Sequence, residues 1–454
     1  MTTIRVCLTL LAILGFSSAN AGILSPFTGL PKNGEVRLFG IQGSNTIGDE
    51  LGPNLAKKYL EEKGATDVQI RNTRFNNEKV VSGFLPDLGT RLTIDIAAHG
   101  SGTGFKGIAS GSSEIAASSR PIKAKEASLL KHIADMSRPS AEHIIGIDGL
   151  AIVVHPSNPV SELSVDEISE IFSGGYTDWS QVGGRPGAIH VYARDENSGT
   201  WDSFKSMVLG NTPLIASAKR FESNAVLSDE VSADDNGIGF VGLSSVRAAK
   251  LLAVSDGSAK ALKPNKLTVA TEDYALSRRL FMYTDDVPEN PYVVEFMSFV
   301  QLNEAQQVVA DSGFISQELK EVVPEFYSEL PSDFREITND AKRLTINFRF
   351  RAGSASLDNK ALKDIERLVN YLQQKGRNDA EVMLIGFGDK KRTEKRSKLL
   401  SKLRAMAVRR ELVRNGIYPE LSVGYGEYLP VASVNRAEGK MKNRRVEVWL
   451  RDNT

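Results

Sequence analysis

The chain of 454 residues contains a single cysteine, Cys7. One thiol cannot form a disulfide within the chain, so a disulfide framework and a cysteine-based metal cluster are excluded. Histidine is also scarce, and the five residues, at 99, 132, 143, 155 and 190, are scattered without metal-ligand spacing. We therefore expect no metal site.

Long apolar runs are absent as well. No segment reaches the roughly 18 apolar residues that a membrane-spanning helix requires, so no transmembrane segment is expected. The apolar run 6–16 is preceded by Arg5 and followed by Ala19-Asn20-Ala21, which is the pattern of a secretory signal peptide. We expect residues 1–21 to be removed on export, and Cys7 with them.

The sequence also lacks the common catalytic motifs G-x-S-x-G, G-x-x-x-x-G-K-[ST] and H-E-x-x-H. The spacing Gly102-x-Gly104-x-x-Gly107 fits a dinucleotide fingerprint, but no acidic residue follows the next strand to hold a ribose. His99 lies near Ser101, although a tight turn disfavours a nucleophile–base pair. The sequence therefore predicts a protein that is not an enzyme and needs no cofactor.

The net charge is zero, but it is unevenly distributed. Residues 341–454 contain 26 Lys and Arg against 13 Asp and Glu, whereas the remaining residues contain 30 against 43. This division indicates two modules with different partners, the second attracted to an acidic polymer or surface. The alternative is a solvated basic face without a partner.

Strand-like and helix-like segments alternate in the first part of the chain. Strands are expected at 35–41, 92–98, near 114–117, 150–154 and 189–193, with helices after the turn 42–46 and over 164–172. Polar turns follow several strands, which is the pattern of open α/β sheets. Ligands of such sheets bind beyond the carboxyl ends of the strands.

Two of these turns have the chemistry of an anion site. Ser44, Asn45 and Thr46 follow the first strand and begin a helix, where hydroxyl and unpaired N–H groups can meet one anion. Ser101 and Thr103 have the same position after the second strand. Each residue could instead be a simple helix cap, and both interpretations remain open here.

The run from Arg194 to Thr200 is the strongest anion motif. It combines a guanidinium group with the hydroxyls of Ser198 and Thr200 and the accessible backbone N–H of Gly199. An oxyanion needs several such donors once its water is removed.

Three further residues belong to this candidate site. Ser119 and Arg120 follow the third strand and add a hydroxyl and a second guanidinium. Asp148 precedes an apolar strand, where it could accept a proton from a protonated anion, orient an arginine or cap a turn.

These segments together resemble the periplasmic phosphate-binding proteins that feed ABC importers, over about residues 35–316. The resemblance is carried by Gly43-Ser44-Asn45-Thr46, His99-Gly100-Ser101-Gly102, Ser118-Ser119-Arg120-Pro121-Ile122, Leu163 to Trp179, Arg194 to Thr200 and Tyr274 to Arg279. It implies two α/β lobes that close on phosphate, lined by Ser44, Asn45, Thr46, Ser101, Ser119, Arg194, Ser198, Gly199 and Thr200. Well-known members have an aspartate where Ser119 stands, so discrimination against sulfate would depend on Asp148 or a backbone carbonyl.

A second module follows a short connection. Residues 318–342 are acidic and contain two prolines, and we expect them to be a linker. Strands are expected at 344–350, 381–387, near 421–425 and 445–450, with helices at 359–374 and 397–415. The expected domains are therefore 22–317 and 343–454.

In the second module, Asp389 follows a strand and Arg404 lies early in the next helix. A carboxylate beside a guanidinium suits a zwitterionic ligand, although the two could instead pair with each other. Their flanks resemble the OmpA-like peptidoglycan-binding domain, through Phe350 to Asp358, Leu400 to Ala405, Gly424-Tyr425-Gly426-Glu427 and Asn443 to Glu447. The resemblance implies that Asp389 and Arg404 hold the diaminopimelate of the stem peptide, with Ser397 at a third motif position.

The module departs from that family at Gly388, Arg392, Ser397 and Val434. A basic loop over 390–398 adds attraction to acidic wall polymers or lipopolysaccharide. Nucleic acid would also suit this charge, but export and the lack of interleaved aromatic residues argue against it.

The sequence thus predicts a two-lobed α/β module of the periplasmic-binding-protein type, followed by a smaller β/α OmpA-like domain. We expect an exported protein that captures phosphate or a similar tetrahedral oxyanion by lobe closure and is attached to peptidoglycan in the periplasm. Association with the outer membrane and with an ABC importer permease is left open. The alternative is a wall-bound structural, adhesive or phosphate-sensing protein that delivers no ligand.

Overall fold

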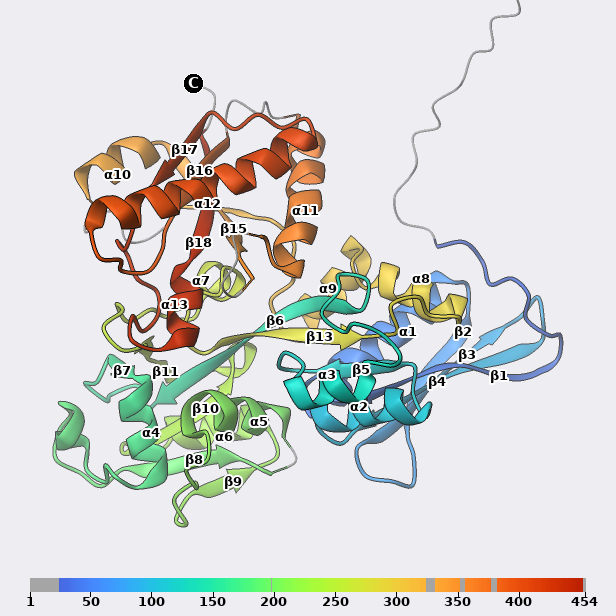
Figure 1. Cartoon of the computed structure of the whole chain (residues 1–454). Helices are drawn as coiled ribbons and strands as arrows, with labels where there is room; N and C mark the ends of the chain where they lie inside the picture. The colour runs from blue at the N-terminus through green and yellow to red at the C-terminus, as the bar shows by residue number, and fades with distance from the viewer. Residues whose placement is uncertain (1–23, 197, 324–330, 352–355, 377–381, 452–454) are drawn as a thin grey trace, which may run out of the picture.

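The computed structural model describes residues 24–451 except 197, 324–330, 352–355 and 377–381. The expected signal peptide and parts of the 318–342 and 350–358 segments lie outside the described residues. Figure 1 shows two lobes side by side and a C-terminal domain above the left-hand lobe, which is drawn in green. Among the described residues, six groups of buried side chains form the cores, two in each of these three parts.

Lobe 1 combines the N-terminal segment with a segment from much later in the chain. Its elements are β1 (Gly34–Gly43), η1 (Ile47–Leu51), α1 (Gly52–Glu62), β2 (Thr66–Asn72), β3 (Glu78–Leu85), β4 (Thr90–Ala98), α2 (Ser101–Ser110), β5 (Ile115–Ser118), α3 (Ala124–Leu130), α8 (Pro291–Phe299) and α9 (Asn303–Asp311). Leu51, the last residue of η1, and Leu55 and Leu60 of α1 are buried in its core.

Lobe 2 is formed by the central part of the chain. Its elements are β7 (Glu162–Ser164), α4 (Val165–Ser173), η2 (Trp179–Val182), β8 (His190–Arg194), α5 (Gly199–Phe204), η3 (Lys205–Leu209), β9 (Lys219–Phe221), α6 (Asn224–Ser232), β10 (Gly237–Gly242), η4 (Leu243–Ser245), β11 (Lys250–Leu251), β12 (Ala253–Ser255) and α7 (Lys266–Ala270). A capping box at Ser164 and Glu167 fixes the start of α4.

Two antiparallel strands, β6 (Glu142–Val154) and β13 (Ser277–Tyr283), connect the lobes. The sheet runs in the order β2-β3-β4-β1-β5-β13-β6-β10-β8-β9, so one sheet continues through both lobes. In lobe 1 the parallel strand β1 lies between β4 and β5. The turns after β1, β4 and β5 therefore meet at one edge of the sheet.

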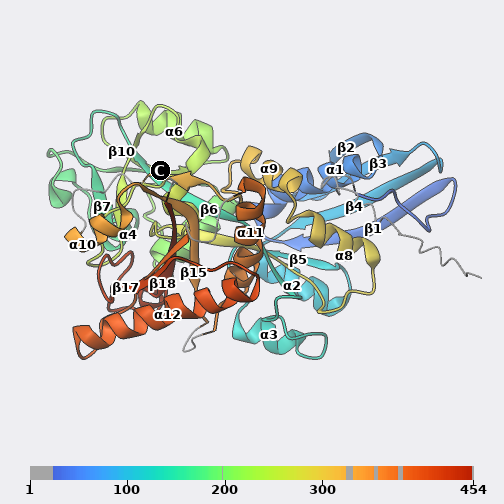
Figure 2. The ribbon, with the colours of Figure 1, turned by 90° about the horizontal axis from the view of Figure 1, so that it is seen from above.

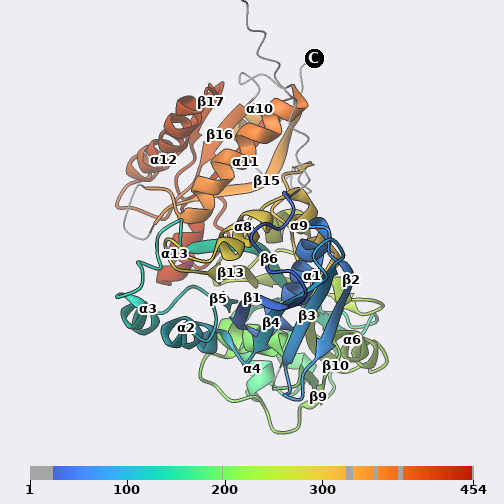
Figure 3. The same cartoon turned by 90° about the vertical axis from the view of Figure 1, so that its right-hand side faces the viewer.

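The C-terminal domain has a five-stranded sheet in the order β14-β15-β18-β16-β17. Its elements are β14 (Glu321–Val322), α10 (Ser332–Thr338), β15 (Ala341–Arg349), α11 (Asn359–Lys375), β16 (Val382–Gly386), α12 (Glu394–Arg414), β17 (Leu421–Gly424), α13 (Ala437–Asn443) and β18 (Arg445–Arg451). Figure 3 shows α11 and α12 along one side of this sheet. The segment 318–342, expected to be a linker, contains β14 and α10, and Phe334 of α10 is buried in this domain.

The predicted fold class is confirmed: a two-lobed α/β module precedes a smaller β/α domain. Several boundaries differ by a few residues, and the largest difference is in β6. The strand expected at 150–154 begins eight residues earlier, at Glu142, so that Asp148 lies within β6 and not ahead of a strand. Among the described residues, none of the helices has the length and apolar character needed to cross a membrane.

Candidate functional site

In lobe 1, two of the predicted serines lie side by side. Ser101 is the first residue of α2 and follows Gly100, whose φ of 96° favours glycine. Ser119 comes directly after β5; its backbone N–H donates to Ser101 Oγ at 3.2 Å, and the two Oγ atoms are 3.4 Å apart. The turns after β4 and β5 therefore present a pair of hydroxyls at the N-terminus of a helix.

In lobe 2, the predicted Arg194 is buried. Its Nε donates to the carbonyl oxygen of Phe221 at 3.1 Å, its Nη2 donates to that of Glu222, and its Nη1 lies 3.4 Å from Thr200 Oγ1. Burial lowers the pKa of Arg194 despite the nearby charge of Asp195. The side chain therefore stabilises the 221–222 backbone and faces Thr200 from the same lobe.

Ser198 has the role of a helix cap. Its Oγ accepts hydrogen bonds from the N–H groups of Thr200 and Trp201, at 3.2 and 3.4 Å, at the start of α5. The Ser198 hydroxyl therefore caps α5. The next residue, Gly199, makes the contact between the lobes.

The two lobes touch at Gly199 and Thr46. A Cβ atom on Gly199 would lie 2.1 Å from the backbone nitrogen of Thr46, which leaves no room for any side chain. Ser44 is buried in the same turn, and Asn45 and Thr46 are half-buried. The turns after β1 and β8, from different lobes, are thus brought together as the sequence predicted.

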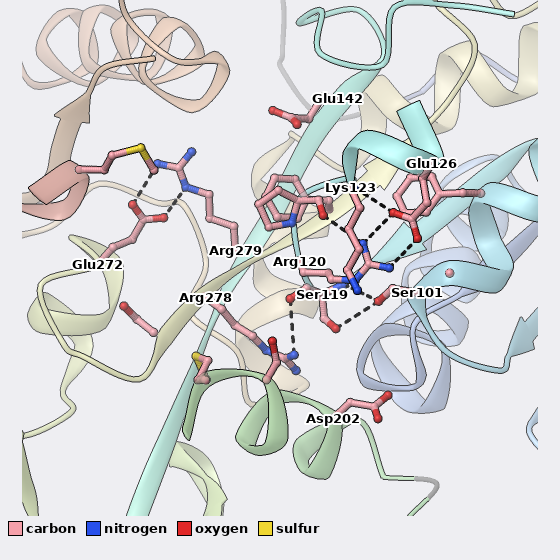
Figure 4. A pocket seen from close by; sticks show the side chains of 18 of the residues that line it. Ser101, Ser119, Arg120, Lys123, Glu126, Glu142, Asp202, Glu272, Arg278 and Arg279 are labelled. Carbon is pink, nitrogen blue, oxygen red and sulfur yellow. Dashed lines mark hydrogen bonds and ion pairs between the residues drawn. The ribbon is translucent and has the colours of Figure 1, made fainter. Parts of the chain in front are cut away.

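Arg278, in β13, is the residue that joins these turns. Its Nη2 donates to Thr46 Oγ1 at 2.7 Å and to the carbonyl oxygen of Gly199 at 3.2 Å. Its Nη1 lies 3.5 Å from the carbonyl oxygen of Ser119 (Figure 4). Burial lowers the pKa of Arg278, whereas the charge of Asp148 raises it. No local sequence pattern indicates a role for Arg278, although the Tyr274–Arg279 segment is part of the family resemblance.

Asp148 orients this arginine. Its Oδ2 accepts from Arg278 Nε at 3.1 Å, and the two side chains are 7% and 10% exposed. Of the three roles considered for Asp148, the structure shows the second.

Arg120 faces elsewhere. Its two terminal nitrogens donate to Glu126 at 2.8 and 2.7 Å, and the Oε2 of Glu126 also accepts from the N–H of Lys123. Arg120 still lines the cleft, but both ends of its guanidinium fork are engaged by a carboxylate.

A cleft of about 1390 Å³ opens beside these groups. Ser101, Ser119 and Arg278 line it together with Asp202 of α5 (Figure 4). Desolvation raises the pKa of Asp202, while the charge of Arg278 acts in the opposite direction. Asp202 is the second site residue that the sequence did not reveal. It lies two residues beyond the Arg194–Thr200 motif, and nothing in the local sequence marks its carboxylate.

In the C-terminal domain, Asp389 is already paired with two cations. Its Oδ1 accepts from Arg444 Nε at 2.9 Å, and its Oδ2 accepts from Lys391 Nζ at 2.7 Å. Burial acts to raise the pKa of Asp389, but the hydrogen bonds from Arg444 and Lys391 hold it well below its usual range. Ser397 supports this loop, since its Oγ accepts from the N–H of Lys391 at 3.0 Å.

Arg404 lies beside the same carboxylate loop. Its guanidinium carbon is 5.9 Å from the ring centroid of Phe350, and burial lowers its pKa against the opposing charge of Asp389. A Cβ atom on Gly388 would lie 2.8 Å from Arg404 Nη1. The glycine that replaces the family's usual threonine therefore provides the space that this guanidinium occupies.

Within the part of the chain that the structure describes, no cluster of three His, Cys, Asp or Glu side chains is placed to hold a metal ion.

Comparisons with known proteins match both modules. A family model described as a PBP superfamily domain matches residues 82–304, and that of the OmpA family matches residues 349–444. Over 276 residues the chain is 30% identical to the phosphate-binding protein PstS of Staphylococcus saprophyticus. The aligned region covers 59% of this chain and 83% of the relative.

Solved structures align with each module. An ABC-type phosphate transport receptor from Vibrio cholerae aligns with 24% identity and a TM-score of 0.48, over 61% of this chain and 99% of that one. The peptidoglycan-associated lipoprotein from Burkholderia pseudomallei aligns with 25% identity and a TM-score of 0.20, over 22% of this chain and 86% of that one.

Proposed function

The chain belongs to the PstS family of phosphate-binding proteins, and on that premise we propose that its two-lobed domain captures phosphate or a similar tetrahedral oxyanion as the lobes close. The observation that carries this proposal is Arg278, whose guanidinium lies within 3.5 Å of Thr46, Gly199 and Ser119, from three turns and both lobes. A desolvated oxyanion needs convergent donors from several directions. Only closed lobes bring these three turns to one guanidinium, which is the donor proposed for the anion.

We propose that the anion lies next to Arg278, at the edge where the polar turns meet. The residues proposed to line or support this site are Ser44, Asn45, Thr46, Ser101, Ser119, Asp148, Arg194, Ser198, Gly199, Thr200, Asp202 and Arg278. Arg120 would join them only by leaving Glu126. None of these roles requires bond making, so the proposed domain is a receptor and not a catalyst.

The carboxylate of Asp202 favours phosphate over sulfate. At neutral pH phosphate retains a proton and sulfate does not, so an acceptor in the site discriminates between them. Asp148 is engaged by Arg278, whereas Asp202 lines the cleft and replaces the acceptor that Ser119 does not provide.

Isothermal titration of the full chain with phosphate and with sulfate tests this proposal. We expect saturable heat with phosphate and at least tenfold weaker binding of sulfate. An absence of heat with both anions would show that the domain does not bind tetrahedral oxyanions.

The C-terminal domain is an OmpA-family domain, and we propose that it attaches the chain to peptidoglycan. Asp389, Ser397 and Arg404 are proposed to hold the diaminopimelate of the stem peptide. Support comes from the proximity of Arg404 to the Asp389 loop. The test is sedimentation with purified sacculi: wild-type protein should pellet, and an Asp389→Ala/Arg404→Ala variant should remain in the supernatant.

The location follows from these two proposals. We propose that residues 1–21 direct export, that residues 22–317 and 343–454 are the two functional domains, and that the protein works in the periplasm beside peptidoglycan and near the outer membrane. If the protein acts in transport, we propose that it delivers the bound anion to an ABC importer permease.

A second candidate function is that of a wall-bound phosphate sensor that delivers nothing. One observation favours it: the C-terminal domain is seated on both lobes, through Asn359 against lobe 1 and Arg436 against lobe 2. Phosphate uptake by cells with and without the chain distinguishes the two candidates, since only a transport receptor would increase the rate of uptake.

A further inference from the structure

The C-terminal domain is held to lobe 1 by its helix α11. Asn359 Nδ2 donates to the carbonyl oxygen of Ser137 at 2.9 Å and to Glu142 Oε1 at 3.0 Å. Two turns further along the helix, Arg367 Nη2 donates to Gln301 Oε1 at 2.6 Å. Seen from above in Figure 2, α11 lies over the region between the lobes, and it packs against β6.

The same domain is held to lobe 2 by the segment around α13. The N–H of Ser433 donates to Asp256 Oδ2 at 3.1 Å, and the guanidinium of Arg436 pairs with the same carboxylate. At the other end of α13, Lys442 Nζ donates to the carbonyl oxygen of Ala275 at 3.0 Å. Asp256 and Ala275 both belong to lobe 2.

Between these two attachments lies a buried charge network. Glu272 and Asp273, in the turn between α7 and β13, are 9% and 3% exposed. Arg349 Nε donates to Glu272 Oε2 at 2.9 Å, and Arg343 Nη2 donates to Asp273 Oδ2 at 2.6 Å. A buried carboxylate is strongly destabilising without its partner, so these residues commit the C-terminal domain to this position.

Arg279 connects this network to the connecting strands themselves. Its guanidinium pairs with Glu272 and, at 2.8 Å, with Asp358 at the start of α11. Arg279 is next to Arg278 in β13, so the strand that supports the anion site also supports the C-terminal domain. The contacts on the two lobes are made by one rigid domain, and the lobes cannot rotate about β6 and β13 without changing at least one of them.

We propose that the C-terminal domain is a clasp across the hinge: its docking stabilises the arrangement in which the lobes touch, and anion binding and docking therefore favour each other. The contact between Gly199 and Thr46 shows that the docked arrangement is one in which the lobes meet. By linkage, two events that favour the same conformation strengthen each other reciprocally. The anion part of this inference depends on the proposed function, whereas the clasp itself does not.

Pulsed electron-spin resonance on the full chain tests the clasp without any ligand. Spin labels are attached at Glu61→Cys in lobe 1 and Glu230→Cys in lobe 2, on a Cys7→Ser background, because both side chains are exposed. An Asn359→Ala/Arg367→Ala variant removes the hydrogen bonds from α11 to Ser137, Glu142 and Gln301 and changes none of the residues proposed for the anion site. The matched control, Glu411→Ala/Arg414→Ala, removes an ion pair confined to the C-terminal domain.

We expect a narrow distance distribution in the parent and the control, and a broader distribution with longer distances in the Asn359/Arg367 variant. Arg436→Ala, which loosens the other attachment at a half-exposed side chain, should broaden it in the same way. Distributions in both variants that superimpose on the parent would overturn the clasp.

Phosphate titration then separates the two proposals. Parent protein that gives no heat contradicts the proposed function alone, since the distances still decide on the clasp. If the parent binds phosphate, we expect both loosened variants to bind it about fivefold or more weakly, as is typical of coupled sites. Unchanged affinity in both variants would overturn the coupling.

Discussion

Arg278 and Arg279 are consecutive in β13, yet their guanidinium groups lie in different parts of the molecule. Arg278 contacts Asp148 and the turns of both lobes, whereas Arg279 contacts Glu272, in the turn between α7 and β13, and Asp358 of the C-terminal domain. The division follows from strand geometry, because successive side chains point to opposite faces. One short strand therefore carries both the centre of the proposed anion site and the attachment of the second domain.

Arg278→Ala should weaken phosphate binding by about 30-fold or more, because losing one partner of a buried charged hydrogen-bond network costs about 2 kcal/mol or more. Arg278→Lys keeps the charge without the fork-shaped geometry and should recover part of the affinity. Arg247→Ala, which removes an exposed pair with Asp229, is the control and should bind phosphate like the parent. Titration calorimetry provides the measurement, and equal affinities of the Arg278→Ala variant and the control would contradict the assigned role.

Gly199→Ala should impair lobe closure. The added Cβ would lie 2.1 Å from Thr46 nitrogen, which is backbone and cannot move aside alone. We expect phosphate affinity to fall at least tenfold, with a melting temperature within a few degrees of the parent, because the clash arises only between lobes. The matched control is Gly242→Ala in the same lobe, where an added Cβ meets nothing within 4 Å; similar losses in both variants would argue for a general effect of the methyl group.

Lys391→Ala should strengthen binding to sacculi. Lys391 Nζ is 2.7 Å from Asp389 Oδ2, where the ammonium group of a stem peptide is proposed to bind, so the side chain competes with the ligand. Lys395→Ala, an exposed basic residue in the first turn of α12, reports the loss of general attraction alone and should weaken binding slightly. Sedimentation at several salt concentrations distinguishes the two effects; weaker pelleting of both variants would exclude competition by Lys391.

Glu272→Gln should destabilise the chain by about 3–5 kcal/mol, because it leaves Arg279 and Arg349 short of a buried counter-charge. Burial acts to raise the pKa of Glu272, but the charge of Arg279 dominates and holds it far below its usual range. A depressed carboxyl pKa stabilises the fold above the unfolded pKa of about 4.3, and this stabilisation is lost as the pH falls below that value. The unfolding free energy of the parent should therefore decline on acidification, and that of the variant should decline less.

Denaturant titrations between pH 7 and pH 3 measure this difference. Glu230→Gln, an exposed carboxyl on α6, serves as the control and should follow the parent. Parallel curves for parent and Glu272→Gln would mean that Glu272 does not titrate differently in the folded and unfolded states.

The strands that surround the anion turns could be predicted from the sequence because their apolar alternation is local. The first half of β6 could not, since Glu142 and Asp148 interrupt its apolar pattern. These charges are accommodated by partners remote in sequence: Tyr283 donates to Glu142, and Arg278 to Asp148. Only the tertiary structure makes a strand of this segment.

The candidate site shows the same limit. The hydroxyl turns could be found because strand ends and glycines mark them locally. Arg278 could not, since its partner Asp148 lies 130 residues earlier and the Thr46 hydroxyl 232 residues earlier. Similarly, Asp389 and its partner Arg444 are 55 residues apart in the sequence. The sequence therefore indicated a ligand site of two residues, where the structure has a cluster of charges.

The C-terminal domain also contributes to the rim of the cleft, where Arg436, Gly439, Met441 and Lys442 stand opposite residues of both lobes. A transporter that received ligand from this cleft would therefore contact the C-terminal domain as well as the two lobes.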